Sequence, residues 1–276
     1  MQANIALTID CGRRLFAEVL RLNNRGYPIL ERGVRRTGLE GICALAVMAK
    51  APRPGKVKTR LQPPLSAEVA AALNVCFLRD TAENIASVTS NGKAQGLISY
   101  TPVGDEAAFD GLLPEGFALI AQRGNEFGER LLCAAEDILS CGFGAVCLID
   151  SDSPTLPSDA LRTAVAELMR PGERTVIGAS DDGGYYLIGM KRAEPGLFER
   201  IAWSTERVYA ETIERAREAG LQLVELPKWY DVDDAGTLVM LERELLLGEL
   251  PAFAKVDGFD ARWTREFLAE RVSEAS

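Results

Sequence analysis

The chain has 276 residues, of which 47% are hydrophobic and 26% charged, a composition typical of one large globular domain with or without extensions. Its formal net charge of −9 argues against broad binding to nucleic acids or anionic membranes, because the overall field repels phosphate. There is no histidine, which excludes Ser-His-Asp and Cys-His catalysis and histidine-containing zinc sites. Acid–base chemistry must then come from carboxylates, lysine, tyrosine or water.

The cysteines form no C-x-x-C pair; they are Cys11, Cys43, Cys76, Cys133, Cys141 and Cys147. Cys43 and Cys147 lie in apolar runs, so we interpret them as small buried hydrophobes of a reducing compartment and not as a disulfide framework. No apolar run approaches the roughly 20 residues that span a bilayer, and the N-terminus does not have the order of a signal peptide. We therefore expect a cytoplasmic protein.

Residues 1–40 differ in character from the rest of the chain. Cys11 to Leu22 could form one amphipathic helix, Asn23 to Gly26 is a turn signal, and a basic group follows at Arg32, Arg35 and Arg36. We expect an N-terminal extension outside the main fold. Packing on the core, self-association into a homodimer and poor order remain open alternatives.

Strand-like and helix-like patterns alternate between residues 42 and 247, which predicts an α/β fold with a mostly parallel sheet covered on both faces. The expected strands are Ile42–Ala49, Gly96–Thr101, Phe117–Ala121, Ala145–Ile149, Arg174–Ala179, Tyr185–Met190 and Leu221–Leu226. The expected helices are Ser66–Val88, Glu129–Leu139, Ser158–Met169, one capped by Ser204 or Thr205 and ending near Ala219, Ala235–Leu247 and Asp260–Val272. Ser66 and Ser158 are the expected caps of their helices. The division is an extension (1–40), a main domain (41–247) and a C-terminal helical tail (248–276).

A basic loop follows the first expected strand. Between Lys50 and Leu61 it contains two prolines and a glycine, and five of the eleven positions from Lys50 to Arg60 are Lys or Arg in an otherwise acidic protein. A cationic loop in this place is where a nucleotide-binding α/β fold receives phosphates. The spacing of a Walker loop is absent. A solvated basic loop is the alternative.

Acidic residues follow the strand Ala145–Ile149. Asp150 and Asp152 are two positions apart, so an extended backbone would send both side chains to one face, and Pro154 prevents the strand from continuing. Ligands of open α/β sheets bind beyond the carboxyl ends of strands, where paired carboxylates can hold a hard cation and phosphate oxygens. Alternatively, one aspartate caps the next helix and the other is solvated.

Two further patches lie at expected strand ends. Ser180-Asp181-Asp182-Gly183-Gly184 is a turn whose glycines allow close backbone approach or positive φ, and the alternative is a plain hairpin turn. Tyr230-Asp231-Val232-Asp233 again places acidic residues two apart.

The basic loop, the acidic residues after Ala145–Ile149 and the two patches just described follow one another along the chain. In this order they resemble the GT-A, or nucleotide-diphospho-sugar transferase, superfamily over residues 42–245. More narrowly, the chain resembles the glycosyltransferase-like branch linked to arsenosugar biosynthesis, and more distantly the phospholactate and molybdopterin guanylyltransferases. The resemblance implies a Rossmann-like GT-A fold that binds a nucleotide diphosphate together with Mg²⁺ or Mn²⁺.

The resemblance also implies site residues. Lys58 and Arg60 would contact phosphates, with Lys50 and Trp203 as further nucleotide contacts, and Asp152 would bind the metal. Asp182, Gly183 and Gly184 would line the donor or acceptor pocket, and Asp182 is a candidate base. Asp233 would be the second metal carboxylate or a base, and Asp150 is an added metal ligand or a neighbour. The charge balance agrees, because a dication between carboxylates and a diphosphate removes their repulsion.

Three functions follow as hypotheses. The first is transfer of a glycosyl group from a nucleotide-diphospho-sugar to a small-molecule acceptor. The second is nucleotidyl transfer from a nucleoside triphosphate to a phosphorylated small molecule, which the number of cations favours slightly. The third is a non-catalytic nucleotide-binding domain, which acidic and basic sets at the same strand ends disfavour.

Overall fold

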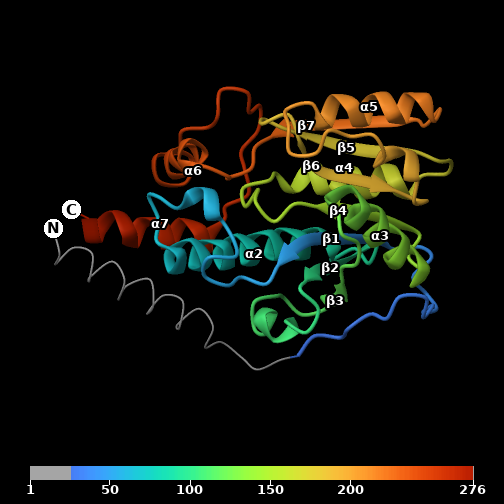
Figure 1. The fold of residues 1–276 in the computed structure, drawn as a ribbon, viewed down its shortest axis with the longest axis horizontal. Helices are drawn as coiled ribbons and strands as arrows, with labels where there is room; N and C mark the ends of the chain where they lie inside the picture. The colour runs from blue at the N-terminus through green and yellow to red at the C-terminus, as the bar shows by residue number, and fades with distance from the viewer. Residues whose placement is uncertain (1–25, 276) are drawn as a thin grey trace.

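The computed structural model describes residues 26–275 (Figure 1). The amphipathic helix expected between residues 11 and 22 lies outside these residues. Seven strands form one sheet in the order β3-β2-β1-β4-β6-β5-β7. In chain order they are β1 (Cys43–Lys50), β2 (Ala94–Thr101), β3 (Ala118–Ala121), β4 (Ala145–Ile149), β5 (Thr175–Ser180), β6 (Tyr185–Met190) and β7 (Leu223–Trp229).

The sheet is mostly parallel, as the sequence predicts. Strands β1, β2, β3 and β4 pair in parallel, as do β5 and β7. Only β6 is antiparallel to its two neighbours, β4 and β5. Because the β5–β6 hairpin turns at Asp181–Gly184, the start of β6 lies at the same edge of the sheet as the carboxyl ends of the other strands.

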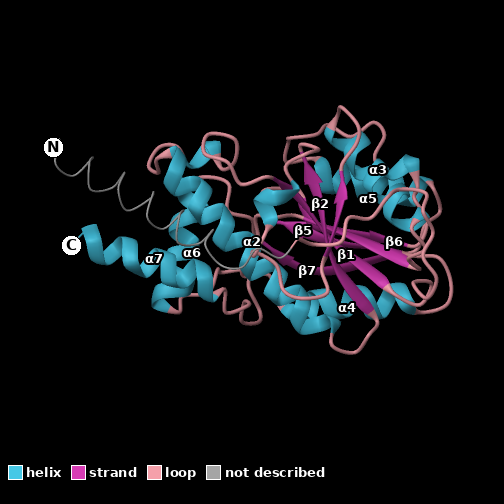
Figure 2. Cartoon of the chain, turned by 90° about the horizontal axis from the view of Figure 1, so that it is seen from below, coloured by secondary structure: helices cyan, strands magenta, loops and turns pink. Residues whose placement is uncertain are grey.

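Helices cover both faces of the sheet (Figure 2). One face carries α2 (Ala67–Thr89) and α4 (Ser158–Met169), and the other carries α3 (Phe127–Ser140) and α5 (Val208–Glu218). Two more helices, α6 (Ala235–Leu247) and α7 (Arg262–Ala275), follow the last strand, and three short 3₁₀ turns occur at Thr59–Leu61, Glu106–Phe109 and Pro195–Leu197. The α/β prediction with both faces covered is therefore confirmed.

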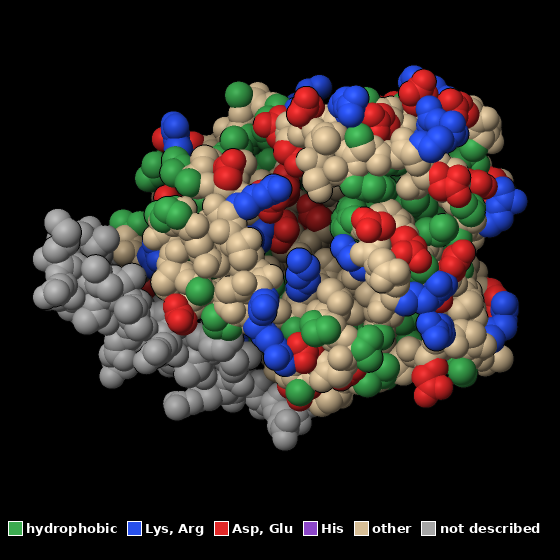
Figure 3. All heavy atoms as spheres, in the orientation of Figure 1, with side chains coloured by type: hydrophobic (Ala, Val, Ile, Leu, Met, Phe, Trp, Pro, Cys, Tyr) green, Lys and Arg blue, Asp and Glu red, His purple; other side chains and the backbone are tan. Residues whose placement is uncertain are grey.

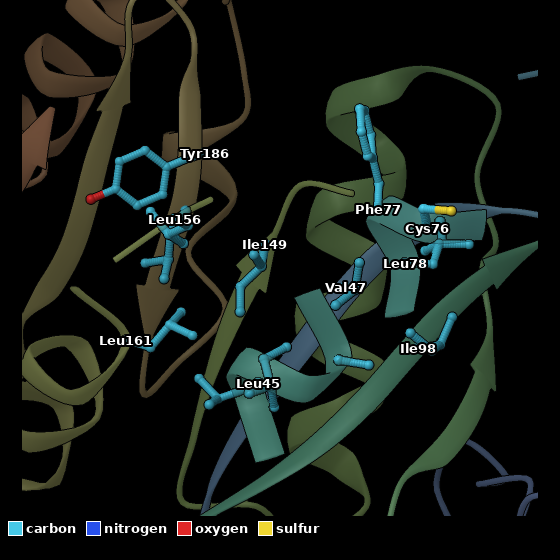
Figure 4. Close-up of a cluster of buried hydrophobic side chains, with 14 of the residues drawn as sticks. Leu45, Val47, Cys76, Phe77, Leu78, Ile98, Ile149, Leu156, Leu161 and Tyr186 are labelled. Carbon is cyan, nitrogen blue, oxygen red and sulfur yellow. The ribbon is translucent and has the colours of Figure 1, made fainter. Parts of the chain in front are cut away.

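The strand period of two divides the apolar side chains between two cores. In β1, Leu45 and Val47 face the core under α2 and α4, whereas Ala44 and Ala46 face the core under α3. Figure 4 shows the first of these cores, where Ile149 of β4 and Leu161 of α4 lie beside the β1 side chains. A strand buried on both faces explains the unbroken apolar run that the sequence shows from Ala145 to Ile149.

The expected helix ends are correct in part. Ser66 caps α2, because its Oγ accepts a hydrogen bond from Val69 N at 3.2 Å. Ser158 does not cap α4; it is the first residue of the helix, and its Oγ donates to Asn84 Oδ1 of α2. Likewise α5 begins only at Val208, three residues after Thr205, whose Oγ1 donates to Ala202 O instead.

The C-terminal helix α7 packs on α2 through one buried carboxylate. Asp80 of α2 accepts hydrogen bonds from Trp263 N and from both Thr264 N and Thr264 Oγ1. These N–H groups belong to the first turn of α7, which has no helical partners for them. Asp80 thus serves as an N-terminal cap supplied by another helix.

The five described cysteines are free and buried, as the sequence predicts. Within residues 26–275, no helix is both long enough and apolar enough to cross a bilayer.

Candidate functional site

Two adjoining cavities open at the carboxyl ends of the parallel strands. They share five lining residues: Lys50, Arg60, Phe127, Asp152 and Asp233. Lys50 ends β1, the two aspartates follow β4 and β7, and Phe127 begins α3. The space-filling view shows a recess with acidic groups at its floor and Lys and Arg side chains around its rim (Figure 3).

The first cavity, of about 290 Å³, is basic. Lys50, Lys56, Lys58 and Arg60 line it, and among the described residues Asp152 and Asp233 are the only carboxylates in its lining. We name it the basic cavity. Four cations around so small a volume suit a ligand with several negative charges.

Lys58 joins the three loops that form this cavity. Its Nζ lies 2.7 Å from Asp152 Oδ1 and 3.5 Å from Asp233 Oδ1, and it donates to the carbonyl oxygen of Val232 at 2.7 Å. Only 3% of the Lys58 side chain is exposed. Its backbone has φ 48°, a left-handed conformation uncommon for a residue other than glycine, and this places the side chain inward from the loop. The ammonium group therefore neutralises the carboxylates of two different loops.

A backbone contact fixes the same loops. Val232 N donates to Asp152 O at 2.9 Å, and Arg60 Nη1 lies 3.4 Å from Asp233 Oδ2. Asp150 turns toward its own loop, where its carboxylate accepts from Ser153 Oγ at 2.8 Å and from Asp152 N at 3.3 Å. The aspartates after β4 and β7 are thus held in place by the protein itself.

The second cavity, of about 570 Å³, is acidic and partly aromatic, and we name it the acidic cavity. Its carboxylates are those of Asp150, Asp152, Asp182, Asp231, Asp233 and Glu206, and its aromatic side chains are Phe127, Tyr185 and Trp203. Trp203 meets Phe127 edge to face, with ring centroids 5.2 Å apart, and Tyr185 in the same way at 6.5 Å. Lys50 and Arg60 are the cations at its border with the basic cavity.

Burial and mutual repulsion raise the pKa values of several of these aspartates. Burial, with added repulsion from Asp152 and Asp231, raises the pKa of Asp150 well above its usual value. Burial also raises the pKa of Asp231 to about 6, although the hydrogen bond that Ser180 Oγ donates to it at 2.5 Å lowers that pKa. The pKa of Asp233 is raised by burial and by Asp152, although Lys58 and Arg60 oppose that shift. Such crowded carboxylates are typical of functional sites.

The structure brings together nearly all residues that the sequence singled out. Lys50, Lys58, Arg60, Asp150, Asp152, Asp182, Gly184, Trp203 and Asp233 line one or both cavities. Gly183 is not among the lining residues. Its φ of +92° and a virtual Cβ 2.2 Å from Glu206 O show that it allows a close approach to the 203–208 loop. At Gly183, the close approach that the sequence predicts is therefore an approach to another part of the chain.

Sequence reasoning missed other lining residues. Asn74 of α2 is 4% exposed, lines the basic cavity, and has an amide oxygen with no hydrogen-bond partner in the described chain. It lies within an apolar helix where nothing distinguishes it from a solvent-facing asparagine. Asp231 was noted as half of the acidic pair after the last strand but was given no role, and Tyr185 resembles an ordinary strand residue.

No set of three or more Asp, Glu or Cys side chains in residues 26–275 converges as a metal site. Asp152 and Asp233 nevertheless share one cation, the Lys58 ammonium. Two hard carboxylates without histidine or thiolate suit Mg²⁺ or Mn²⁺ better than zinc, and Mg²⁺ commonly uses one or two carboxylates with water and substrate phosphates. The donor set therefore fits an ion that arrives with a phosphorylated ligand better than a permanent ion.

The arrangement defines a class: a Rossmann-like α/β fold with a polar site across the carboxyl ends of its strands. Residues 84–205 match a family model described as "Uncharacterized protein conserved in bacteria (DUF2064)". No curated protein matches the sequence.

Among solved structures, one from Desulfovibrio desulfuricans G20 bears the description "putative nucleotide-diphospho-sugar transferase". It is 31% identical to this chain, with a TM-score of 0.70, and the match covers 84% of this chain and 96% of that protein. The chain belongs to the family of that protein. The GT-A-like fold expected from the sequence is therefore confirmed, whereas the narrower arsenosugar-linked branch stays a prediction.

Two other solved structures are similar at lower identity. A CMP:2-keto-3-deoxy-manno-octonic acid synthetase complexed with CTP has 14% identity and a TM-score of 0.46, over 76% of this chain and 100% of that one. A cytidylyltransferase from Leptospira borgpetersenii serovar Hardjo-bovis has 13% identity and a TM-score of 0.46, over 84% and 95%.

Proposed function

We propose that this protein is a transferase that takes a nucleotide-diphospho-sugar as donor and moves its glycosyl group to a small-molecule acceptor. One observation carries the proposal: the buried Lys58 ammonium between Asp152 and Asp233, at the border of a basic and an acidic cavity. The basic cavity suits the diphosphate, and the acidic cavity suits a hydroxyl-bearing second substrate. The description of the Desulfovibrio relative supports the same class.

Mg²⁺ or Mn²⁺ is the proposed cofactor, with Asp152 as a protein ligand, Asp233 as the second ligand or instead as the base, and Asp150 as an added ligand or a neighbour. When bound, such an ion would stabilise negative charge on the diphosphate leaving group. The chain's own part is to orient that diphosphate, since Lys50, Lys56 and Arg60 can each donate to phosphate oxygens. Arg60 does this best, because its guanidinium can bind two oxygens at once.

The proposed reaction breaks the bond between the sugar's anomeric carbon and the diphosphate oxygen and forms a bond from that carbon to the acceptor oxygen. The acceptor's hydroxyl proton passes to a carboxylate, and the nucleoside diphosphate leaves with the bonding electron pair. Asp182 and Asp233 are the candidate bases, because both line the acidic cavity in which the acceptor would lie.

Nucleotidyl transfer is a second candidate, and one observation favours it. Four cations line the basic cavity of about 290 Å³, which is more positive charge than a diphosphate requires and suits a triphosphate. In that reaction the acceptor's phosphate would attack the α-phosphorus and pyrophosphate would leave. The acceptor would then bring its own phosphate to the border of the acidic cavity, which the carboxylates there oppose.

Thermal unfolding with Mg²⁺ or Mn²⁺ and a panel of nucleotides tests the proposal. Stabilisation by UDP- or GDP-sugars, followed by release of the nucleoside diphosphate when acceptors are added, supports glycosyl transfer. A shift with CTP or GTP alone, with pyrophosphate release, supports nucleotidyl transfer. If none of these ligands changes the unfolding temperature, both proposals fail.

A further inference from the structure

The acidic cavity contains carboxylates that phosphate binding in the basic cavity does not explain. Asp182, Glu206 and Asp231 line the acidic cavity and not the basic one, and none of the three forms an ion pair within the described part of the chain. Their neighbour Asp181, by contrast, is paired with Lys228. Unpaired carboxylates thus gather inside the cavity, while a carboxylate beside it has a cationic partner.

Three aromatic rings complete the wall on the same side. Trp203 contacts both Phe127 and Tyr185 edge to face, and Phe127 remains 45% exposed. The hydroxyl of Tyr185 is buried and has no hydrogen-bond partner in residues 26–275. Aromatic rings attract a cation through their quadrupole, and neighbouring carboxylates attract it through their negative charge.

The loop that contributes Trp203 and Glu206 is fixed in place. Tyr209 N donates to Gly183 O at 2.8 Å, and the backbone of Glu206 lies against Gly183 so closely that no side chain fits there. Trp203 in turn packs against Gly128 at the start of α3, where a virtual Cβ would be 2.5 Å from its Nε1. The cavity wall therefore exists before any ligand arrives, which reduces the cost of binding.

The two cavities differ in charge at a common border. The basic cavity has four cations and two carboxylates, and the acidic cavity has six carboxylates and two cations. A phosphorylated group entering the acidic cavity beyond Lys50 and Arg60 would meet carboxylates and no further cation among the lining residues that the structure describes.

We infer that the second substrate carries a positive charge: a small hydroxyl compound with an amine or quaternary ammonium group. The cationic group lies among Asp182, Glu206 and the rings of Tyr185 and Trp203, and the hydroxyl points toward the basic cavity. Of the two candidate bases, Asp233, which lines both cavities, would then accept the hydroxyl proton. This inference rests on the proposed function, because it names the class of acceptor for the same site.

The test uses two molecules of the same shape and different charge. Choline and its neutral isostere 3,3-dimethyl-1-butanol are titrated into the full-length protein in the presence of Mg²⁺ and UDP or GDP, with tryptophan fluorescence as the readout. The Trp203→Phe variant identifies the part of the signal that comes from the cavity. Glycerol phosphate is the anionic probe.

We expect choline to bind about ten-fold or more tightly than the isostere, because charge and ring contacts add. Asp182→Asn and Glu206→Gln should each lower this ratio, and Glu115→Gln, which removes an exposed carboxylate outside both cavities, should not. Equal affinity of the isosteres, or tighter binding of glycerol phosphate, overturns the inference. Nucleotide stabilisation of the wild-type protein is measured separately, so its absence would refute the proposed function, whereas its presence with no preference for choline would refute only the acceptor class.

Discussion

The Lys58 ammonium lies 2.7 Å from Asp152 Oδ1, and 3% of the Lys58 side chain is exposed. The loop after β1 and the loop after β4 therefore meet at one charged contact. Asp152 is 29% exposed, so the pair faces the cavities on one side and the protein on the other. Removing a cation and its carboxylate partners from water is costly. A buried ion pair beside a cavity therefore indicates that its residues belong to the site.

Replacing Lys58 by methionine should weaken nucleotide binding about ten- to a hundredfold. The change removes a charge that can reach phosphate, and it leaves Asp152 and Asp233 to repel the ligand. Stability should fall by about 1–3 kcal/mol, because two carboxylates lose their partner. Calorimetric titration with UDP and GDP and urea unfolding measure the two effects. Lys93→Met, the same charge change away from both cavities, should leave the affinity within about twofold.

Metal binding should depend on the nucleotide. Asp152 and Asp233 share the Lys58 ammonium, and the described residues contain no cluster of three metal-ligating side chains. Mn²⁺ should therefore bind weakly alone and about tenfold or more tightly once phosphate oxygens are added. Electron paramagnetic resonance of free Mn²⁺ measures this directly. Asp152→Asn should abolish the nucleotide-dependent gain. Tight Mn²⁺ binding without nucleotide, or an unchanged gain in the variant, would contradict the assignment.

Asn74 should contribute to ligand binding and not to folding. Its buried amide oxygen has no partner in the described chain, so Asn74→Leu should leave stability unchanged or raise it by up to about 1 kcal/mol. Nucleotide affinity should fall about five- to tenfold.

The matched control for Asn74 is Asn84 on the same helix. Asn84 is 2% exposed, donates to Leu156 O at 2.6 Å and accepts from Ser158 Oγ. Asn84→Leu should destabilise the protein by about 1–3 kcal/mol in the same urea unfolding experiment. If both variants lose stability equally, Asn74 has a structural role and the prediction is wrong.

Asp80 should make stability rise as the pH falls. Burial raises its pKa to about 6 in the folded protein, against about 3.9 when unfolded, so the folded state takes up a proton first. Between pH 8 and pH 5 this adds about 1.4 kcal/mol to the free energy of unfolding, and the gain is complete below about pH 4. The difference in stability between the wild type and Asp80→Asn isolates this contribution. No change in that difference between pH 8 and pH 5 would contradict the prediction.

Gly183→Ala should destabilise the β5–β6 turn by about 2 kcal/mol or more. The residue has φ +92°, and its Cβ would lie 2.2 Å from the carbonyl oxygen of Glu206. Gly184→Ala should cost less, because its Cβ would meet only the side chain of Asp182, at 3.0 Å. Thermal unfolding compares them, and similar losses would mean that the contact with Glu206 does not matter.

The sequence of helices and strands along the chain could be predicted from the amino-acid sequence. Strand alternation and helix periodicity depend on neighbouring residues, so the strand Ala145–Ile149 and the helix Ala235–Leu247 appear with the expected bounds. The predicted start of α5 was wrong, because the Thr205 hydroxyl donates a hydrogen bond back to Ala202 O and does not cap the helix. The sequence singled out Asp152, Lys58 and Asp233 because charged residues are conspicuous after an apolar strand, and their roles stay a prediction.

Only the tertiary structure decided how these residues meet. Contacts between segments far apart in the chain place Lys58 between Asp152 and Asp233 and make β6 antiparallel. They also leave the Asn74 amide oxygen without a partner among the described residues and bring Gly183 against Glu206. A sequence pattern records which face of an element is apolar, because that is a local period. It does not record which loop lies opposite, because that depends on strand order and on how the helices pack across the sheet.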